Sequence, residues 1–391
     1  MICVLYILFW LALALVIYTY IGYGIFTAIL VKIKKAFFPS KKYNTDFEPS
    51  VSLIIPCFNE GDFISTKIRN TIELEYPADK LQVIYISDGS NDHSLDILKQ
   101  NQEKYLWMHS PERKGKASAM NRAVLEASGE IVVFCDANTL LNREAIRELV
   151  APYEDPTIGA VTGEKRILVQ NSEHVSSAGE GLYWKYESWL KQLDSDLYSV
   201  VGAAGELMSY RKSFYEPLEP DTILDDFMQS MRVTLKGYRV AYNPKAYAME
   251  TASADVSEEW KRKVRISAGG WQSMSRLKRV LIPWPSPLLT YSYLSHRAFR
   301  WSVAPFSLLI LIITNPILAF YNPYIYVPIL AGQMLFYGLA LHGYWKDKKG
   351  EKNKFSFVPY YFTMMNLAVF FGLARYLKGS QKATWERAKR A

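Results

Sequence analysis

The 391 residues carry a net charge of +8 at pH 7, and half of them are hydrophobic. The positive charge gathers beside apolar segments and in the tail, not in a recognition-helix or zinc-finger pattern; this favours an anionic membrane surface and excludes nucleic acid as partner. The five histidines are too scattered for a zinc site, and the three cysteines show no pairing pattern, as expected in a reducing compartment.

The first apolar segment predicts a transmembrane helix over residues 1–36. It has no charged side chain from Met1 to Val31, and its lysines follow the apolar run. A cleaved signal peptide needs a basic start and a shorter apolar stretch, so a retained span is favoured. Because basic residues stay on the inner side, the next domain is expected in the cytoplasm of a multi-pass protein of the inner or plasma membrane.

Residues 49–274 predict a soluble α/β domain in which strands alternate with helices. The expected strands are Val51–Pro56, Leu81–Ile86 and Glu130–Cys135, and the expected helices are Ile64–Glu75, Ser94–Tyr105, Lys116–Ser128 and Arg143–Tyr153. This alternation implies a doubly wound layer with a mostly parallel sheet. Ligands bind beyond the carboxyl ends of the strands in such sheets.

Polar side chains follow the three predicted strands. Glu60 comes after the first strand, Asp88 after the second and Asp136 directly after the third. Each alone is often a helix cap or turn residue, but three at successive strand ends suit a nucleotide with a divalent cation on its diphosphate. No P-loop, Gly-x-Gly-x-x-Gly or Gly-x-Ser-x-Gly pattern occurs, which disfavours P-loop NTPases, dinucleotide enzymes and serine hydrolases.

Two later segments each have two interpretations. Aromatic residues crowd the stretch 180–197, either as core packing or as a platform for a sugar or lipid acceptor: Tyr183, Trp184, Tyr186 and Trp189. Residues 275–300 combine basic, aromatic and proline residues, which predicts a segment in the membrane interface. A solvated loop is the alternative for that segment.

Residues 301–377 predict the remaining membrane segments. The stretch 301–345 has no Lys, Arg, Asp or Glu and can cross twice, since one crossing takes about 20 residues. A third crossing by the apolar stretch 355–377 would place the basic tail, 378–391, outside, against the positive-inside rule. That stretch is therefore expected to bend or to lie obliquely within a bundle.

Seven short motifs occur in the order found in one enzyme family. They are Ile55–Glu60, Ser87–Ser90, Lys114–Lys116 with Asn121, Asp136–Asn138, Gly202–Gly205, Leu224–Phe227 and Arg262–Arg265. Together they resemble the membrane-bound branch of family 2 glycosyltransferases, which contains hyaluronan, cellulose and poly-N-acetylglucosamine synthases. The resemblance covers about residues 50–272. It implies a GT-A-type nucleotide-sugar-binding domain flanked by transmembrane helices.

The resemblance implies that five residues bind the donor. Glu60 and Asp88 would hold the uridine of a UDP-sugar, and Lys116 would face the donor. Arg262 and Arg265 match the outer positions of Gln-x-x-Arg in the family's Gln-x-x-Arg-Trp motif, with Arg in place of Gln. Arginine forks suit phosphate oxygens.

The resemblance also implies a catalytic and a metal-binding pair. Asp226 would be the general base, with Asp225 beside it, because a sugar hydroxyl is a weak nucleophile and must lose its proton. One base without a covalent nucleophile implies inversion at the anomeric carbon. Asp136 and Asn138 stand at the family's Asp-x-Asp motif and would bind Mg²⁺ or Mn²⁺, although an amide is a poorer ligand than a carboxylate. Without the resemblance, a helix dipole explains the acidic pair equally well.

The acceptor side departs from the family pattern. Ile266 stands where the family has Trp beside the acceptor sugar. Trp271 is expected to take that place if the chain loops through Gly269–Gly270, with Gly205 also on the acceptor side. The alternative is that Ile266 packs in the core and Trp271 anchors at the membrane interface.

The sequence predicts an inverting hexosyltransferase that moves a sugar from a UDP-sugar to a growing polysaccharide at the cytoplasmic face of a membrane, with coupled export as a further expectation. A rival is a non-processive enzyme that adds one sugar to a lipid-linked glycan acceptor. A rival of another class is a nucleotide-binding membrane transporter or scaffold. Membrane lipids are expected partners, and a homo-oligomer or an accessory export subunit stays open.

Overall fold

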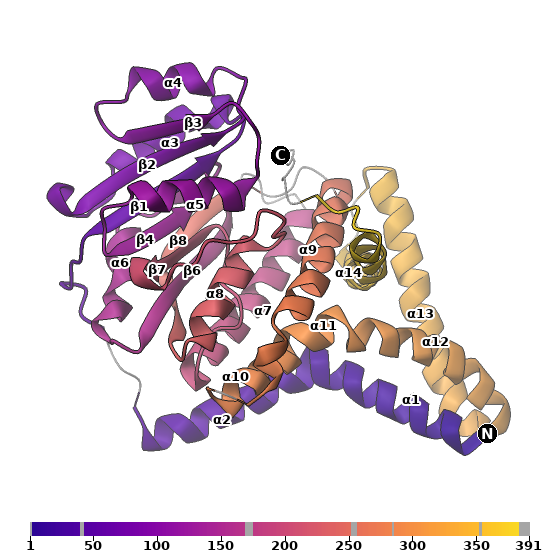
Figure 1. Cartoon of the computed structure of the whole chain (residues 1–391). Helices are drawn as coiled ribbons and strands as arrows, with labels where there is room; N and C mark the ends of the chain where they lie inside the picture. The colour runs from indigo at the N-terminus through magenta and orange to yellow at the C-terminus, as the bar shows by residue number, and fades with distance from the viewer. Residues whose placement is uncertain are drawn as a thin grey trace.

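The computed structural model describes residues 2–39, 43–168, 175–251, 256–283, 285–351 and 354–382. Figure 1 shows an α/β domain built on one sheet, with long helices below it and to its right. Residues 383–391, most of the predicted basic tail, lie outside the described part of the chain.

Eight strands form the sheet. They are β1 (Val51–Cys57), β2 (Leu81–Asp88), β3 (Leu106–Ser110), β4 (Ile131–Cys135), β5 (Leu140–Leu141), β6 (Ile158–Leu168), β7 (Leu207–Arg211) and β8 (Arg239–Thr251). Their order is β3-β2-β1-β4-β7-β6-β8-β5. Strands β1 to β4 pair in parallel, as do β6 and β8, whereas β7 runs antiparallel between β4 and β6. The predicted mostly parallel sheet is confirmed.

Helices cover both faces of the sheet, and β1 is therefore buried along its whole length. Leu53 and Ile55 belong to one apolar cluster and Ile54 to the other, as expected for alternating side chains. The helices of this domain are α3 (Gly61–Ile72), α4 (Ser94–Gln100), α5 (Lys116–Glu126), α6 (Ala145–Val150), α7 (Val175–Leu197), α8 (Asp225–Leu235) and α9 (Val256–Arg276).

Two of the predicted elements have different ends. The helix expected to reach Tyr105 ends at Gln100, because Leu106–Ser110 pairs in parallel with β2 as a strand of its own. Strand β2 runs on to Asp88, which is therefore its last residue and not part of the following turn. Strands β6 to β8 follow the predicted α/β elements and complete the sheet.

Four helices are long and apolar enough to cross a membrane. The first is a continuous run made of α1 (Ile2–Ile17), a π-helical turn (Tyr18–Gly22) and α2 (Tyr23–Phe37). The others are α12 (Val303–Tyr321), α13 (Pro323–Lys348) and α14 (Lys354–Leu377). The uncharged stretch 301–345 thus forms two helices, as a double crossing requires.

The first apolar run has different neighbours in its two halves (Figure 1). In α1, Phe9 packs with Leu318 and Tyr326 of the C-terminal helices. In α2, Tyr23 and Val31 pack with leucines of α7, which belongs to the α/β domain. The second half of this run therefore packs against the α/β domain.

The segment between α9 and α12 packs partly inside the molecule. It consists of a 3₁₀ turn (Lys278–Leu281), α10 (Pro287–Ser292), a π-helical turn (Tyr293–Ala298) and α11 (Phe299–Trp301). Leu289, Tyr293 and Ala298 are buried in one cluster with Phe227 of the α/β domain. Protein therefore covers these apolar residues, and the position of the segment in the membrane interface stays a prediction.

Candidate active site

A cavity of about 890 Å³ lies at the edge of the sheet where β1 and β4 end. Because β7 runs antiparallel to β4, its first residue is at the same edge, with Leu207 opposite Cys135. Nine predicted site residues line this cavity: Glu60, Lys116, Asp136, Asn138, Gly205, Asp225, Asp226, Arg262 and Arg265. Asp88 and Trp271 do not line it.

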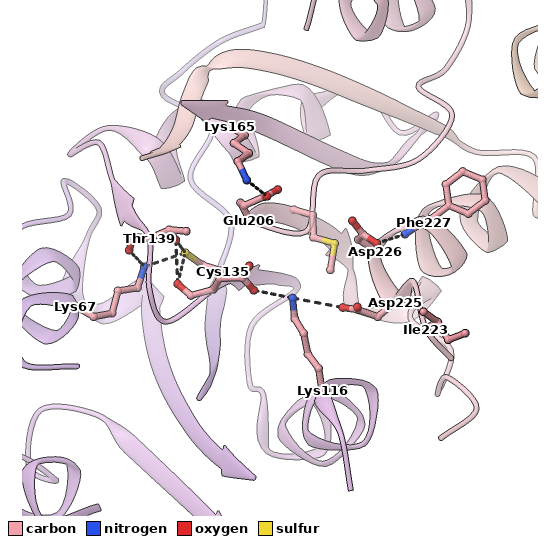
Figure 2. A network of polar contacts seen from close by, with 12 residues as sticks. Lys67, Lys116, Cys135, Thr139, Lys165, Glu206, Ile223, Asp225, Asp226 and Phe227 are labelled. Atoms are coloured by element: carbon pink, nitrogen blue, oxygen red, sulfur yellow. Dashed lines mark hydrogen bonds and ion pairs between the residues drawn. The ribbon is translucent and has the colours of Figure 1, made fainter. Parts of the chain in front are cut away.

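Lys116 links the end of β4 to the start of α8 (Figure 2). Its Nζ lies 2.6 Å from Oδ1 of Asp136 and 3.6 Å from Oδ2 of Asp225. Burial opposes the charge on Lys116, but these two carboxylates outweigh burial and raise its pKa. Lys116 therefore stays a cation between two acids, next to where a donor phosphate would enter.

Asp88 holds the chain that leads into α5. Its carboxylate accepts hydrogen bonds from the backbone N–H groups of Lys114 and Gly115, at 3.1 and 2.7 Å, and from Arg122 at 3.2 Å. The side chain is fully buried. The expected contact of Asp88 with uridine is therefore not supported; the residue positions the turn before Lys116 instead.

The acidic pair begins α8. The backbone N–H of Phe227 donates to Oδ1 of Asp226 at 2.8 Å. Asp226 therefore accepts one of the N–H groups that the start of a helix leaves without a backbone partner. Burial and the neighbouring Asp225 raise the pKa of Asp226 to about 6, although Lys116 acts in the opposite direction. A half-buried carboxylate with a pKa near neutrality can exchange a proton with a ligand in the cavity.

The loop before β7 approaches Asp226 closely. A Cβ on Gly205 would lie 3.1 Å from Oδ2 of Asp226, and a Cβ on Gly202 would lie 2.5 Å from the ring of Phe227. Gly202 also has a φ of +94°, which side-chain-bearing residues rarely adopt. Glycine at both positions therefore lets the loop backbone reach the acidic pair.

Ion pairs hold the opposite wall of the cavity. Glu206 binds Nζ of Lys165 at 2.7 Å and Arg262 at 3.3 Å. Burial opposes the charge on Glu206, but these cations lower its pKa overall. Figure 2 shows the Lys165–Glu206 pair above Lys116 and to the left of Asp226. Arg262 therefore pairs with a protein carboxylate, whereas the resemblance implied that it binds a donor phosphate.

Arg265 remains available to a ligand. Its guanidinium donates to the carbonyl of Ile223 at 3.4 Å and forms no ion pair within the described ranges. Burial and the nearby Arg262 lower its pKa, whereas Asp225, Asp226 and Asp136 favour its charge. Arg265 is thus the better placed of the two predicted arginines for a phosphate.

Trp271 does not face the cavity. Helix α9 continues through Gly269 and Gly270, so the expected loop does not form. A Cβ on Gly270 would lie 2.6 Å from the indole of Trp301, which lines the cavity. The small residue thus makes room for Trp301, and Trp301, not Trp271, is the aromatic residue beside Ile266 in the cavity wall.

The residues at the end of β4 fit a divalent cation. Asp136 and Asn138 offer hard oxygen ligands to the cavity. Lys116 contacts Oδ1 of Asp136, and within the described chain no donor contacts Oδ2. Among the described residues no group of three His, Cys, Asp or Glu could hold a metal. The pair therefore suits a cation that takes most of its ligands from phosphate and water.

Several lining residues were missed by the sequence analysis. They are Arg113, Trp184, Glu187, Lys191, Glu206, Arg297 and Trp301. The aromatic crowding around Trp184 was the one signal that pointed to them, through its alternative as an acceptor platform. Arg113 and Glu206 come from the loops before α5 and β7, and the others come from helical segments. Only tertiary packing identifies which of these residues face the cavity.

The family description "Glycosyl transferase family 2" matches residues 52–218. This stretch contains β2 to β7 and nearly all of β1. It includes Glu60, Lys116 and Asp136 of the cavity wall, whereas Asp225, Asp226 and Arg265 lie beyond it. The chain contains a family 2 glycosyltransferase domain. Its α/β sheet thus has the GT-A-like fold of glycosyltransferases.

Two curated relatives of this family 2 chain are poly-β-1,6-N-acetyl-D-glucosamine synthases. The one from Staphylococcus aureus strain MSSA476 is 27% identical over 248 residues, which cover 60% of this chain and 57% of the synthase. The one from Staphylococcus epidermidis is 26% identical over 241 residues, or 58% of this chain and 56% of the synthase. The chain spans a little over half the length of these relatives.

A solved structure shares the fold of the family 2 chain almost from end to end. It is the mannosyltransferase PcManGT from Pyrobaculum calidifontis, in complex with GDP-Man and Mn²⁺. The TM-score is 0.71 at 22% identity, over 95% of this chain and 99% of the mannosyltransferase. The GT-A-like domain and the flanking apolar helices therefore belong to one shared architecture.

Proposed function

We propose that the protein transfers a sugar from a UDP-sugar to a hydroxyl group of a glycan acceptor, with inversion, at the cytoplasmic face of a membrane. The observation that carries this proposal is the position of Asp226, a half-buried carboxylate with a raised pKa in the cavity wall next to Gly205. Two cationic side chains, Lys116 and Arg265, line the same cavity as Asp226.

Asp226 takes the proton of the acceptor hydroxyl as that oxygen attacks the anomeric carbon. Its Oδ1 is held by the N–H of Phe227, which fixes the orientation of the carboxylate. No described side chain is needed as a covalent nucleophile, so a single displacement inverts the anomeric carbon. General base catalysis of this kind contributes roughly 10²–10⁴-fold to a rate.

The leaving nucleoside diphosphate gains negative charge, which fixed cations stabilise. Lys116 is held in place by Asp136 and Asp225, and Arg265 lies on the neighbouring wall. A divalent cation held by Asp136 and Asn138 would add positive charge at the same phosphates. Glu60, which is 8% exposed and lines the cavity, remains a proposed contact to the nucleoside.

The relatives support a polysaccharide or another glycan as acceptor, since the staphylococcal enzymes are named as poly-N-acetylglucosamine synthases. Because the structure of the mannosyltransferase contains GDP-Man, a guanosine-based donor is included in the test. A cytoplasmic site is supported by the lysines at the end of α2, where Lys34 donates to the carbonyls of Asp196 and Leu197.

The test is release of nucleoside diphosphate by the purified full chain in detergent. UDP-glucose, UDP-N-acetylglucosamine, UDP-glucuronate and GDP-mannose are compared with Mg²⁺, Mn²⁺ or EDTA. Turnover of one UDP-sugar well above the others is expected. No release from any UDP-sugar, or preference for GDP-mannose, would contradict the proposed donor.

Asp226→Asn is expected to keep donor affinity and to slow transfer by roughly 10²–10⁴-fold, because the amide cannot accept the hydroxyl proton. Asp79→Asn is the control, since Asp79 is an exposed acid before β2. Transfer by Asp226→Asn within about threefold of the parent would remove Asp226 from the role of base.

A further inference from the structure

A buried lysine lies in the cavity wall on α7, outside the residues assigned above. Lys191 is 5% exposed and lines the cavity. Within the described chain it forms no hydrogen bond or ion pair, and its Nζ lies 5.9 Å from the centroid of the Trp184 ring. A buried ammonium group without a counter-ion is costly, so an anion is the expected occupant of the adjacent space.

The carboxylates near Lys191 are engaged with other groups. Glu187 binds Arg297 at 2.8 Å and Arg300 at 3.0 Å. Glu206 binds Lys165 at 2.7 Å. Glu164 accepts a hydrogen bond from Ser188 at 2.7 Å. Burial lowers the pKa of Lys191, and the attraction of Glu187 does not cancel this effect. These acids therefore do not neutralise the lysine.

Lys191 lies at the end of the cavity that adjoins the membrane helices. On the same helix α7, Asp194 accepts a hydrogen bond from Tyr23 of α2 and contacts Nδ1 of His296 at 2.6 Å. The segment with His296 continues through α11 into α12, a candidate membrane span. Lys191 therefore lies on the part of α7 that packs against the first apolar run and the segment leading into α12.

Apolar side chains complete the wall near that end. Trp301 packs edge-on against Phe227, with ring centroids 5.1 Å apart, and Ile266 also lines the cavity. Arg297, which lines the cavity too, is fixed by its hydrogen bond to the carbonyl of Val201 at 2.9 Å. An anionic head group next to an alkyl chain matches this combination of cations and apolar surface.

We propose that Lys191 binds the phosphate of a lipid-linked acceptor whose alkyl chain passes Trp301 toward the membrane helices. This inference rests on the proposed function, in that it names the acceptor class for the same cavity. The phosphate anchors the acceptor, and Asp226 deprotonates a hydroxyl farther along it. No bond to the phosphate forms or breaks.

The experiment measures binding to the full chain in detergent by intrinsic tryptophan fluorescence, without a donor. Farnesyl phosphate, farnesol, methyl glucuronide and UDP are the probes. Farnesyl phosphate is expected to bind at least about tenfold more tightly than farnesol, the usual worth of a charged hydrogen bond. Lys191→Met should lose about tenfold affinity for farnesyl phosphate and leave farnesol and UDP unchanged.

Lys185→Met is the matched control, because Lys185 is exposed on the same helix and does not line the cavity. Lys191→Arg keeps the charge and should keep most of the affinity. If Lys191→Met does not fold, the comparison of farnesyl phosphate with farnesol on the parent decides the question.

Three outcomes overturn the proposal: equal affinity for farnesol and farnesyl phosphate, loss of UDP binding in Lys191→Met, or Lys191-dependent binding of methyl glucuronide alone. The second would assign the lysine to the donor, and the third to an acidic sugar. Since no turnover is measured, these failures are distinct from failure of the proposed transfer reaction.

Discussion

Asp226 has two tasks that its environment makes compatible. It accepts the N–H of Phe227 in the first turn of its own helix, and its partial burial next to Asp225 raises its pKa to about 6. A base must be deprotonated to act, so activity is lost as the pH falls through that value. We expect kcat/KM to be about half its maximum at pH 6 and about one tenth at pH 5.

The check is a pH profile of kcat/KM with the best donor, because that ratio reports the free enzyme. Asp225→Asn is the informative variant. It removes the negative neighbour that raises the pKa of Asp226, so its acidic limb should move to lower pH. A rate that stays level down to pH 5 in the parent would speak against titration of Asp226.

At the scale of single residues, the sequence predicted those that belong to continuous motifs. Asp136, Asp225 and Asp226 all line the cavity. The resemblance assigned Asp88 to the uridine, yet two N–H groups of the loop before α5 and Arg122 of α5 donate to its carboxylate. Lys191 could not be predicted, since its burial without a counter-ion arises only when α7 packs against the cavity.

At the scale of elements, the sequence pattern misled at the two glycines of α9, Gly269 and Gly270. Two consecutive glycines favour a break in a helix, and the sequence analysis therefore expected a loop. The helix continues because Gly270 packs against the indole of Trp301, and Gly269 packs against Ile223 and Leu224. Close packing with distant segments, which a local pattern does not contain, explains both glycines.

Gly270→Ala tests that packing. The added Cβ would lie 2.6 Å from Cδ2 of Trp301, so the indole or the helix must shift, and we expect a loss of about 1–3 kcal/mol in stability. Thermal unfolding in detergent measures it. Gly338→Ala in α13 is the control, because nothing lies within 4 Å of that Cβ. Equal melting temperatures for the two variants would show that Trp301 is not packed against Gly270.

At the scale of the whole molecule, the fold class and two C-terminal helices were predictable from alternation and from uncharged stretches of membrane length. The different packing partners of the two halves of the first apolar run were not predictable. Its hydropathy is that of one long span, yet Tyr23 in its second half is fully buried and donates a hydrogen bond to Asp194 of the α/β domain. Composition does not distinguish lipid from protein as the apolar neighbour.

The same ambiguity applies to α14, which composition alone allows to cross. Near its start, Tyr361 donates to Glu259 of α9 at 3.0 Å. Near its end, a Cβ on Gly372 would lie 2.5 Å from Cβ of Ser267, also in α9, and Arg375 lines the cavity. Figure 1 shows α14 beside α9, between the α/β domain and α13. Both parts of α14 therefore contact one helix of the glycosyltransferase domain.

If α14 crossed the bilayer, one of its ends would lie on the opposite side of the membrane from the α/β domain. We therefore expect the loop before α14 and the turn after it to lie on the same side as the α/β domain, which also keeps the lysines of both on the inner side. Single cysteines at Gly350, Gly379 and Asp79 sample the three places, and all are exposed. The background is Cys3→Ser, because Cys57 and Cys135 are buried and Cys3 is exposed.

An impermeant maleimide applied to sealed vesicles of known orientation should label all three positions from one side only. Native Cys3, in the first turn of α1, should react from the other side in the parent protein, and so controls for vesicle sealing. Labelling of Gly350→Cys and Gly379→Cys from opposite sides would show that α14 crosses the membrane. In that case its contacts with α9 could not persist along the helix, because the bilayer would separate one end of α14 from the domain.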